Sequence, residues 1–323
     1  MPTSAENNNR KDHRQGGVSG IGKIIVVLGP TASGKTTLGV DLALQFNGEI
    51  ISADSRQVYK DMDIGTGKDL DEYGNVSYHL LDVVSPNTKF HLAKYQKLAF
   101  KAIDDILKRG KIPIIVGGSG LYLQAVVDNY NLSRTKPDGK LRNKLEKKTV
   151  EELFAELKKI NSKFANKLNN SEKNNKRRLI RYIEIMQDKG ARPLMRGRTP
   201  KPEYEFLLLG LTWSKEILRE RIYKRLVKRL EKENMVKEIR DLHEKKKVSW
   251  KRLESFGLEY RFVSRYLRNK LKYDEMVEKL NIAIRQFSKK QMSWFKRWEK
   301  QDRKIYWIKD KKEAEKLVKK FLK

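Results

Sequence analysis

The chain has 323 residues, a length typical of two domains or of one domain with a large insertion. It contains no cysteine, which excludes disulfides and thiolate metal sites and agrees with a cytoplasmic protein. The formal net charge is +31, but residues 1–125 carry only +2 of it (15 Lys and Arg against 13 Asp and Glu), whereas residues 126–323 carry +29 (57 against 28). A lysine-rich genome would raise lysine throughout, so the imbalance favours a polyanionic partner for the second part.

The first segment, residues 1–21, is polar and has no apolar stretch of the kind found in secretory signals. We expect a disordered tail there. No run of the chain approaches 18 apolar residues, so we also expect no membrane span.

The first predicted strand, residues 23–28 (KIIVVL), leads into GPTASGKT and then into an apolar helical stretch. Strand, glycine loop and helix are the context in which G-x-x-x-x-G-K-[ST] binds phosphate, through backbone N–H groups and the helix N-terminus. Lys35 would add a positive charge, and the hydroxyl of Thr36 can hold Mg²⁺. The predicted diphosphate-binding residues are Gly29, Pro30, Thr31, Ala32, Ser33, Gly34, Lys35 and Thr36.

The identity of the phosphate ligand is left open by the loop itself. NTPases and kinases usually have a second acidic residue after a later strand, where it binds magnesium. The later strand here, residues 112–118 (IPIIVGG), runs into Ser-Gly without an acid. This weakens the case for ATP and leaves room for a diphosphate ester that is not a nucleotide.

An acid does follow the second predicted strand, GEIISA, where Asp54 begins the segment DSRQ. The carboxyl ends of parallel strands face the ligand crevice in sheets of this type. Asp54 could therefore accept a proton from an incoming nucleophile, with Arg56 and Gln57 offering groups that bind a base edge. The alternative is that Asp54 only caps a turn.

Residues 126–201 interrupt the alternation of strands and helices with polar, lysine-rich helical sequence, and strand character returns at residues 205–213. We predict an α/β protein whose catalytic core comprises residues 22–125 and 202–323, with a helical insertion at 126–201 and a helical C-terminal region. Within the insertion, Arg177, Arg178 and Arg181 are spaced to suit phosphate or base contacts, although a solvated helix face is equally compatible. Near the C-terminus, Trp294 and Phe295 could stack on bases but are more typical of a core.

Three segments together resemble the tRNA dimethylallyltransferases, also called tRNA isopentenyltransferases: GPTASGKT, EIISADSRQVYKDMDIGTGK and PIIVGGSGLYLQAV. NKRRLIRYIEI and RQFSKKQMSWFKRW are similar as well, so the resemblance extends over roughly residues 22–298. It implies transfer of a dimethylallyl group from dimethylallyl diphosphate to the exocyclic N6 of adenine 37 in the tRNA anticodon loop. The implied partners are tRNA and dimethylallyl diphosphate, with Mg²⁺ as cofactor, and we expect a monomer.

The resemblance also implies roles for individual residues. Asp54 matches the base that takes the N6 proton, Thr31 matches a hydroxyl aimed at the leaving diphosphate, and Arg225 matches a cationic diphosphate contact, which on its own would be taken for a solvated helix charge. The implied tRNA-binding residues are Asp54, Ser55, Arg56, Gln57, Ser119, Arg177, Arg178, Arg181, Tyr260 and Arg261.

Three other functions fit part of the sequence. A small-molecule P-loop kinase would explain the loop and Asp54, but not the charge of the second part. An adenylate isopentenyltransferase would share the chemistry without needing the basic insertion. A non-enzymatic RNA-binding protein would not need Lys35, Thr36 and Asp54.

Overall fold

The computed structural model describes residues 21–132, 135, 137–188 and 204–323. Most of the predicted tail, residues 1–20, lies outside the described residues. The chain divides into two compact units, one formed by residues 1–123 and 203–323 and the other by Gln124–Pro202. Within the described part of the chain, no helix combines the length and the apolar character needed to cross a membrane.

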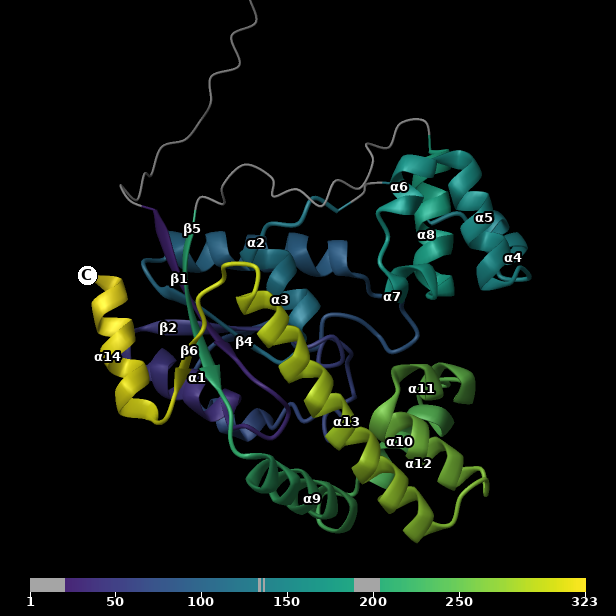
Figure 1. Cartoon of the computed structure of the whole chain (residues 1–323). Helices are drawn as coiled ribbons and strands as arrows, with labels where there is room; N and C mark the ends of the chain where they lie inside the picture. Colours follow the sequence, from purple (N-terminus) through teal and green to yellow (C-terminus); the bar gives the residue numbers. More distant parts are fainter. Residues whose placement is uncertain (1–20, 133–134, 136, 189–203) are drawn as a thin grey trace, which may run out of the picture. The chain divides into compact units, whose positions relative to one another are not determined.

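A six-stranded sheet forms the centre of the first unit (Figure 1). The strand order is β3-β2-β4-β1-β5-β6, and every pairing between neighbours is parallel. The strands are β1 (Gly22–Leu28), β2 (Gly48–Ser52), β3 (Tyr78–His79), β4 (Ile112–Gly117), β5 (Tyr204–Leu211) and β6 (Tyr306–Ile308). The predicted α/β class with a parallel sheet is confirmed.

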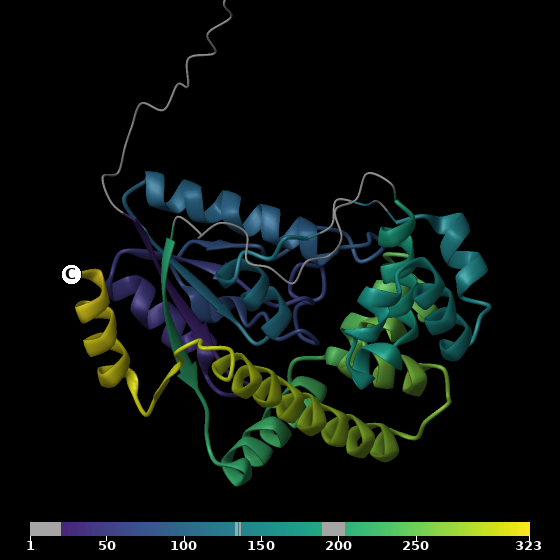
Figure 2. The same cartoon turned by 45° about the horizontal axis from the view of Figure 1, so that its top comes forward.

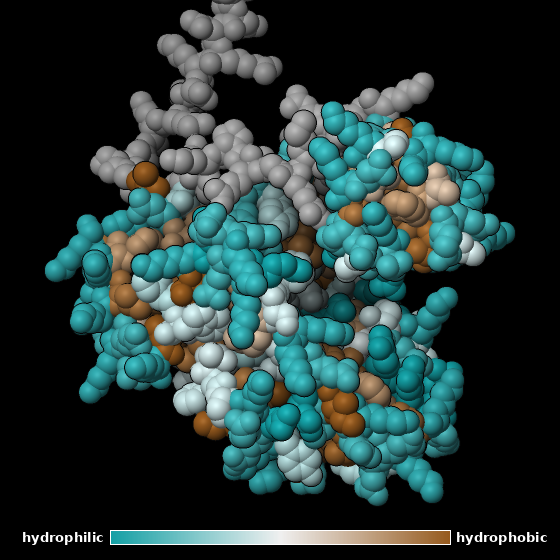
Figure 3. Space-filling view, viewed as in Figure 1, coloured by the Kyte–Doolittle hydropathy of each residue, from teal (hydrophilic) through white to brown (hydrophobic). Residues whose placement is uncertain are grey.

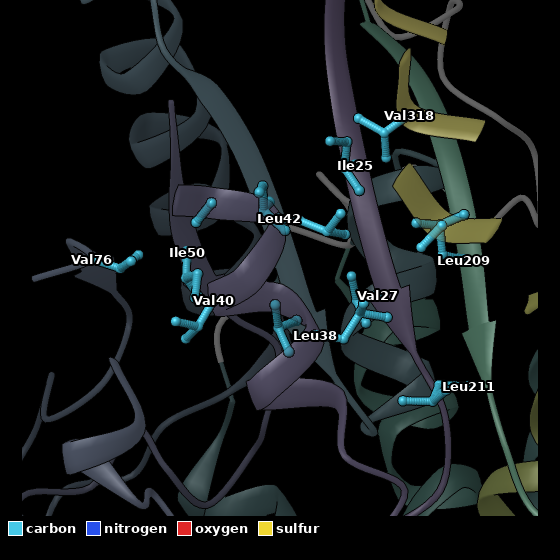
Figure 4. Close-up of a cluster of buried hydrophobic side chains, with 14 of the residues drawn as sticks. Ile25, Val27, Leu38, Val40, Leu42, Ile50, Val76, Leu209, Leu211 and Val318 are labelled. Atoms are coloured by element: carbon cyan, nitrogen blue, oxygen red, sulfur yellow. The ribbon is translucent and has the colours of Figure 1, made fainter. Parts of the chain in front are cut away.

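Helices cover both faces of this sheet. Ile25 and Val27 of β1 pack with Leu38 of α1 (Lys35–Gln45) and Val318 of α14 (Lys311–Leu322) in one buried apolar cluster (Figure 4). Alternate residues of a strand point to opposite faces, so the equally buried Ile24 and Val26 face the other side, where α2 (Leu92–Lys108) contacts β2 and β4 (Figure 2). Burial on both faces explains why these strands are continuous β-branched runs.

A group of helices follows β5 and forms its own core. They are α9 (Lys215–Glu231), α10 (Met235–Glu244), α11 (Trp250–Phe256), α12 (Leu258–Leu267) and α13 (Tyr273–Glu299). The segment after β2 packs into this core through Val58, Tyr59 and Met62, together with Ile239 of α10 and Leu280 of α13. The loop that carries Asp54 is thereby held between the sheet and these helices.

The second unit contains α4 (Gly139–Leu145), α5 (Val150–Ile160), α6 (Ser162–Asn166), α7 (Asn170–Lys173) and α8 (Lys176–Gln187). Leu153 and Leu157 of α5 pack against Leu179 and Ile183 of α8 in a separate small core. The helix α3 (Gly120–Val127) follows β4 and runs across the boundary of the two units, and the short 3₁₀ helix η1 (Leu70–Tyr73) precedes β3. Hydrophilic residues cover most of the displayed molecular face (Figure 3).

Candidate active site

The glycine loop between β1 and α1 is fixed through its carbonyl groups. Lys35 Nζ donates to the carbonyl of Pro30 (2.6 Å), Arg221 Nε donates to that of Ala32 (2.7 Å), and Trp213 Nε1 donates to that of Ser33 (2.9 Å). Gly34 adopts φ 93°, in the left-handed region that glycine enters without a steric penalty. With these carbonyl groups bound by the protein, the loop is preorganised to offer N–H groups to an anion at the N-terminus of α1.

A row of arginines on α9 faces this loop. Arg221, Arg225 and Arg229 are spaced four residues apart, which places them on one side of the helix, and all three line the same cavity as the loop. Arg225 donates a hydrogen bond to the hydroxyl of Thr31. Thr31 and Arg225, two residues predicted to contact the diphosphate, therefore lie in direct contact.

The pKa values of two basic residues in the site are lowered by burial and by neighbouring positive charges. Burial in the cavity, followed by the positive charge of Arg225, lowers the pKa of Lys35 from 10.5 to about 7, although Asp54 acts in the opposite direction. Burial and then the neighbouring Arg229 lower the pKa of Arg225 to about 10. Desolvation and like charges both disfavour the protonated forms, and a bound anion would relieve both effects.

Asp54 lies two residues beyond β2, in the turn that opens the segment DSRQ. Its Oδ1 accepts a hydrogen bond from the backbone N–H of Arg56 (2.8 Å), so the carboxylate does cap a turn. Among the described residues, the other oxygen, Oδ2, accepts no hydrogen bond, and Asp54 lines the cavity. One oxygen thus orients the side chain while the other is available to a ligand.

The neighbours of Asp54 connect the ends of β2 and β4. Ser119 Oγ accepts from the backbone N–H of Ser55 (3.1 Å). The amide of Gln57 is used inside the protein, because Oε1 accepts from Ser52 (2.9 Å) and Nε2 donates to the carbonyl of Gly67 (2.8 Å). Gln57 therefore uses its hydrogen-bonding groups to shape the loop, although it borders the cavity together with Ser55 and Ser119.

The cavity has a volume of about 600 Å³, within the range of small-molecule sites. Of the eight predicted loop residues, Gly29, Pro30 and Ser33 do not line it. The predicted site residues that do line it are Thr31, Ala32, Gly34, Lys35, Thr36, Asp54, Ser55, Arg56, Gln57, Ser119, Arg225 and Tyr260.

The residues present are compatible with a magnesium ion that also binds substrate phosphates. No group of three acids or histidines within the described residues could hold a metal by itself. The Thr36 hydroxyl and the carboxylates of Asp69 and Glu72 nevertheless share the cavity with the phosphate loop. Mg²⁺ in such sites usually keeps several waters and takes one or two protein ligands besides the phosphates.

The predicted tRNA-binding residues on other helices have different environments. Tyr260 is 2% exposed, and its hydroxyl donates to Glu238 (2.8 Å). Arg261 is exposed and donates through Nε to the carbonyl of Glu254 (3.3 Å). Phe295 is fully buried, so its interpretation as a core residue is confirmed.

The three arginines of α8 also differ. Arg181 donates to Glu184 (3.2 Å) and to the carbonyl of Thr135 (2.8 Å). Arg178 lies 3.8 Å from Glu172. Arg177 is exposed, and within the described part of the chain no acidic partner contacts it. Of these three arginines, Arg177 is therefore the one whose charge is not balanced by an acidic residue in the described part of the chain.

Among the cavity residues that sequence reasoning missed are Arg229, Glu259 and Gln291. The four-residue spacing of Arg221, Arg225 and Arg229 was a signal for the first. Glu259 and Gln291 reach the cavity from α12 and α13 through the packing of the helical region, which no local pattern reveals.

Fold and cavity together define a P-loop α/β protein that places a carboxylate beside a cationic phosphate cradle. A family model described as IPP transferase matches residues 57–298. The chain belongs to the IPP transferase family. The predicted resemblance is confirmed, and with it the predicted class of enzyme, a prenyltransferase.

Similar proteins cover most of the chain. A tRNA dimethylallyltransferase 1 from Geotalea uraniireducens is 44% identical over 285 residues, which are 88% of this chain and 92% of that protein. A tRNA dimethylallyltransferase 2 from Citrifermentans bemidjiense is 45% identical, with coverages of 89% and 91%.

Two solved structures are also similar. A full-length tRNA isopentenylpyrophosphate transferase from Bacillus halodurans has a TM-score of 0.64 and 32% identity, and the match covers 93% of this chain and 94% of that one. A eukaryotic dimethylallyltransferase acting on tRNA has a TM-score of 0.72 and 30% identity, with coverages of 84% and 69%.

Proposed function

We propose that this protein transfers a dimethylallyl group from dimethylallyl diphosphate to N6 of adenine 37 in the anticodon loop of tRNA. The observation that carries the proposal is one cavity shared by Lys35, Arg225 and the carboxylate of Asp54. A cationic phosphate cradle suits a diphosphate leaving group. A carboxylate in the same cavity suits a nucleophile that must lose a proton.

The diphosphate is held by the N–H groups of the loop, by Lys35 and by Arg225. The Thr31 hydroxyl accepts a hydrogen bond from Arg225, and in the proposed reaction it donates its own hydrogen to the leaving oxygen. Thr36 would hold Mg²⁺, which supplies additional positive charge against the diphosphate. These groups stabilise the charge that develops as the C–O bond breaks.

The acceptor adenine has to leave the base stack before N6 can reach the donor. The N6 lone pair attacks the allylic carbon, the C1–O bond breaks, and its electron pair leaves with the diphosphate. The proton from N6 passes to Asp54, whose hydrogen bond from the Arg56 N–H keeps the carboxylate oriented.

We further propose that the enzyme is a cytoplasmic monomer. This chain brings the phosphate loop, Arg225 and Asp54 into one cavity, so the proposed reaction uses no residue of a second copy. The tRNA is held by the strongly basic second part of the sequence.

The function is tested in parallel reactions. Each contains the protein and dimethylallyl diphosphate, together with total tRNA, AMP or ATP. Mass spectrometry of the nucleosides should find a C₅ group on N6 of adenosine from tRNA, at position 37. Transfer to free AMP alone would identify an adenylate isopentenyltransferase. Phosphoryl transfer from ATP without any prenyl transfer would identify a kinase.

A further inference from the structure

The side chain of Gln291 joins the two halves of the cavity. Gln291 lies on the long helix α13 (Figure 1) and is 6% exposed. Its Oε1 accepts from the backbone N–H of Thr31 in the phosphate loop (2.8 Å), and its Nε2 donates to the carbonyl of Gly118 after β4 (2.9 Å). One buried amide therefore connects two loops that are distant from it and from each other in sequence.

The orientation of this amide is fixed by its partners. A backbone N–H can only donate and a backbone carbonyl can only accept, so the oxygen must face Thr31 and the nitrogen must face Gly118. The fit at Gly118 is close, because a Cβ there would lie 2.3 Å from Nε2. Glycine at this position lets the amide approach the loop.

Each loop held by Gln291 belongs to a different half of the proposed reaction. Thr31 receives the hydrogen bond of Arg225 on the diphosphate side. Gly118 precedes Ser119, which holds the backbone of Ser55 beside Asp54 on the acceptor side. The amide therefore restrains the separation between the leaving group and the base.

We propose that Gln291 is a positioning residue that sets the distance between the diphosphate-binding loop and the acceptor-binding loop. The inference rests on the proposed function. A misplacement of about 1 Å can cost about 10²-fold in rate. Loss of the bridge should therefore slow the transfer step more than it weakens the binding of either substrate.

The first test is Gln291→Met, which keeps the length of the side chain and removes both hydrogen bonds. Single-turnover prenylation of a tRNA anticodon stem-loop should fall by about 10²-fold, while dissociation constants for dimethylallyl diphosphate and tRNA change little. The matched control is Gln286→Met, the same replacement at an exposed position of α13, which should keep the wild-type rate. A folded Gln291→Met protein with the wild-type rate would overturn the proposal, and so would an unchanged rate with only weaker binding.

The second test, Gln291→Glu, separates positioning from a purely structural role. The ionised carboxylate of this variant can accept a hydrogen bond from the backbone N–H of Thr31. Its second oxygen is also an acceptor, however, and cannot donate to the carbonyl of Gly118. Once protonated, it can donate to Gly118 and accept from Thr31, reproducing the pattern of glutamine. The rate of Gln291→Glu relative to wild type should therefore rise as the pH falls. Lys35 and Arg225 line the same cavity, so a negative charge at position 291 would also raise their pKa values. The ratio is therefore compared with the dissociation constant of dimethylallyl diphosphate at each pH.

A ratio that does not depend on pH would contradict the proposal. The wild-type reaction in the same assay distinguishes a failure of the proposed function from a failure of the positioning role alone. If wild type does not prenylate the stem-loop, the proposed function fails. If wild type is active and Gln291→Met matches it, only the positioning role fails.

Discussion

The two ends of the central sheet hold charge in opposite ways. At the amino end, Glu49 of β2 is 2% exposed and is contacted by three basic residues: Arg109, Lys111 (2.8 Å) and His79 (2.8 Å). The hydrogen bonds from Arg109, ahead of an opposing effect of burial, hold the pKa of Glu49 well below its usual range. The buried ion at this end already has its partners within the chain.

At the carboxyl end, Lys35 and Arg225 lie together. Burial and the charge of Arg225 lower the pKa of Lys35, and burial and the charge of Arg229 lower the pKa of Arg225. Asp54 offsets this only in part. A buried ion with partners of opposite charge stabilises the fold, whereas an excess of like charge in a cavity favours the binding of a ligand of opposite charge. The diphosphate supplies the missing charge in the proposed reaction.

The largest expected effect is at the carboxyl end, with Asp54→Asn. Asparagine caps a turn about as well as aspartate, so thermal stability should hardly change. The proton acceptor is lost, and the single-turnover rate should fall by roughly 10²- to 10⁴-fold. Asp71→Asn, at an exposed acid outside the cavity, is the control. A stable Asp54→Asn protein with a near-normal rate would reduce Asp54 to its capping role.

A smaller effect, on stability and not on rate, is expected from Glu49→Gln at the amino end of the sheet. This change removes charged hydrogen bonds from a buried site and should lower the free energy of unfolding by about 1–3 kcal/mol, with the rate of folded enzyme unchanged. Urea denaturation measures the first quantity and single-turnover kinetics the second.

The pH dependence of stability provides the control for Glu49. Folding lowers the pKa of this group, so its contribution is complete above the ordinary value of 4.5 and is lost as the pH falls below it. Acid should therefore destabilise wild type more steeply than Glu49→Gln. Equal slopes would show that the basic residues around Glu49 do not stabilise its charge.

The smallest effect concerns α8, where the same contrast occurs between neighbouring arginines. Arg181 is bound to the buried Glu184, like the ions of the amino end, while Arg177 is exposed. Arg177→Ala should reduce the slope of log affinity for tRNA against log salt by about 0.7–0.9 for one lost phosphate contact. Stability should not change. Arg181→Ala should instead destabilise the second unit, and salt-independent tRNA binding by wild type would reject the electrostatic interpretation.

The sequence predicts the parts of this protein that local patterns encode. β-branched runs predict β1, β2 and β4, because strands buried on both faces need such residues continuously. GPTASGKT predicts the phosphate loop, and Asp54 is predicted at the ligand edge because it follows a parallel strand. The two-residue β3 and the three-residue β6 are too short to show a period, and no prediction identified them.

The rest of the site depends on tertiary packing. Gln291 lies 260 residues from Thr31, and no spacing rule connects them. The side chains of Gln57 and Tyr260 could be predicted as ligand contacts from their type, but their hydrogen-bonding groups are used by Gly67 and Glu238 inside the protein. Whether a polar side chain serves a ligand or the fold is decided by neighbours that only the folded structure brings together.

The carboxyl end of the sheet holds an excess of positive charge, which the diphosphate relieves in the proposed reaction. The direct test is calorimetry of dimethylallyl diphosphate binding at pH 8, without tRNA, in two buffers that differ in ionisation enthalpy. Burial and the charge of Arg225 lower the pKa of Lys35 to about 7 in the free protein, and the bound anion should raise it again. We expect net proton uptake by wild type, almost none by Lys35→Met, and an affinity of wild type that falls as the pH rises above 7. Equally tight binding by wild type without proton uptake would contradict it.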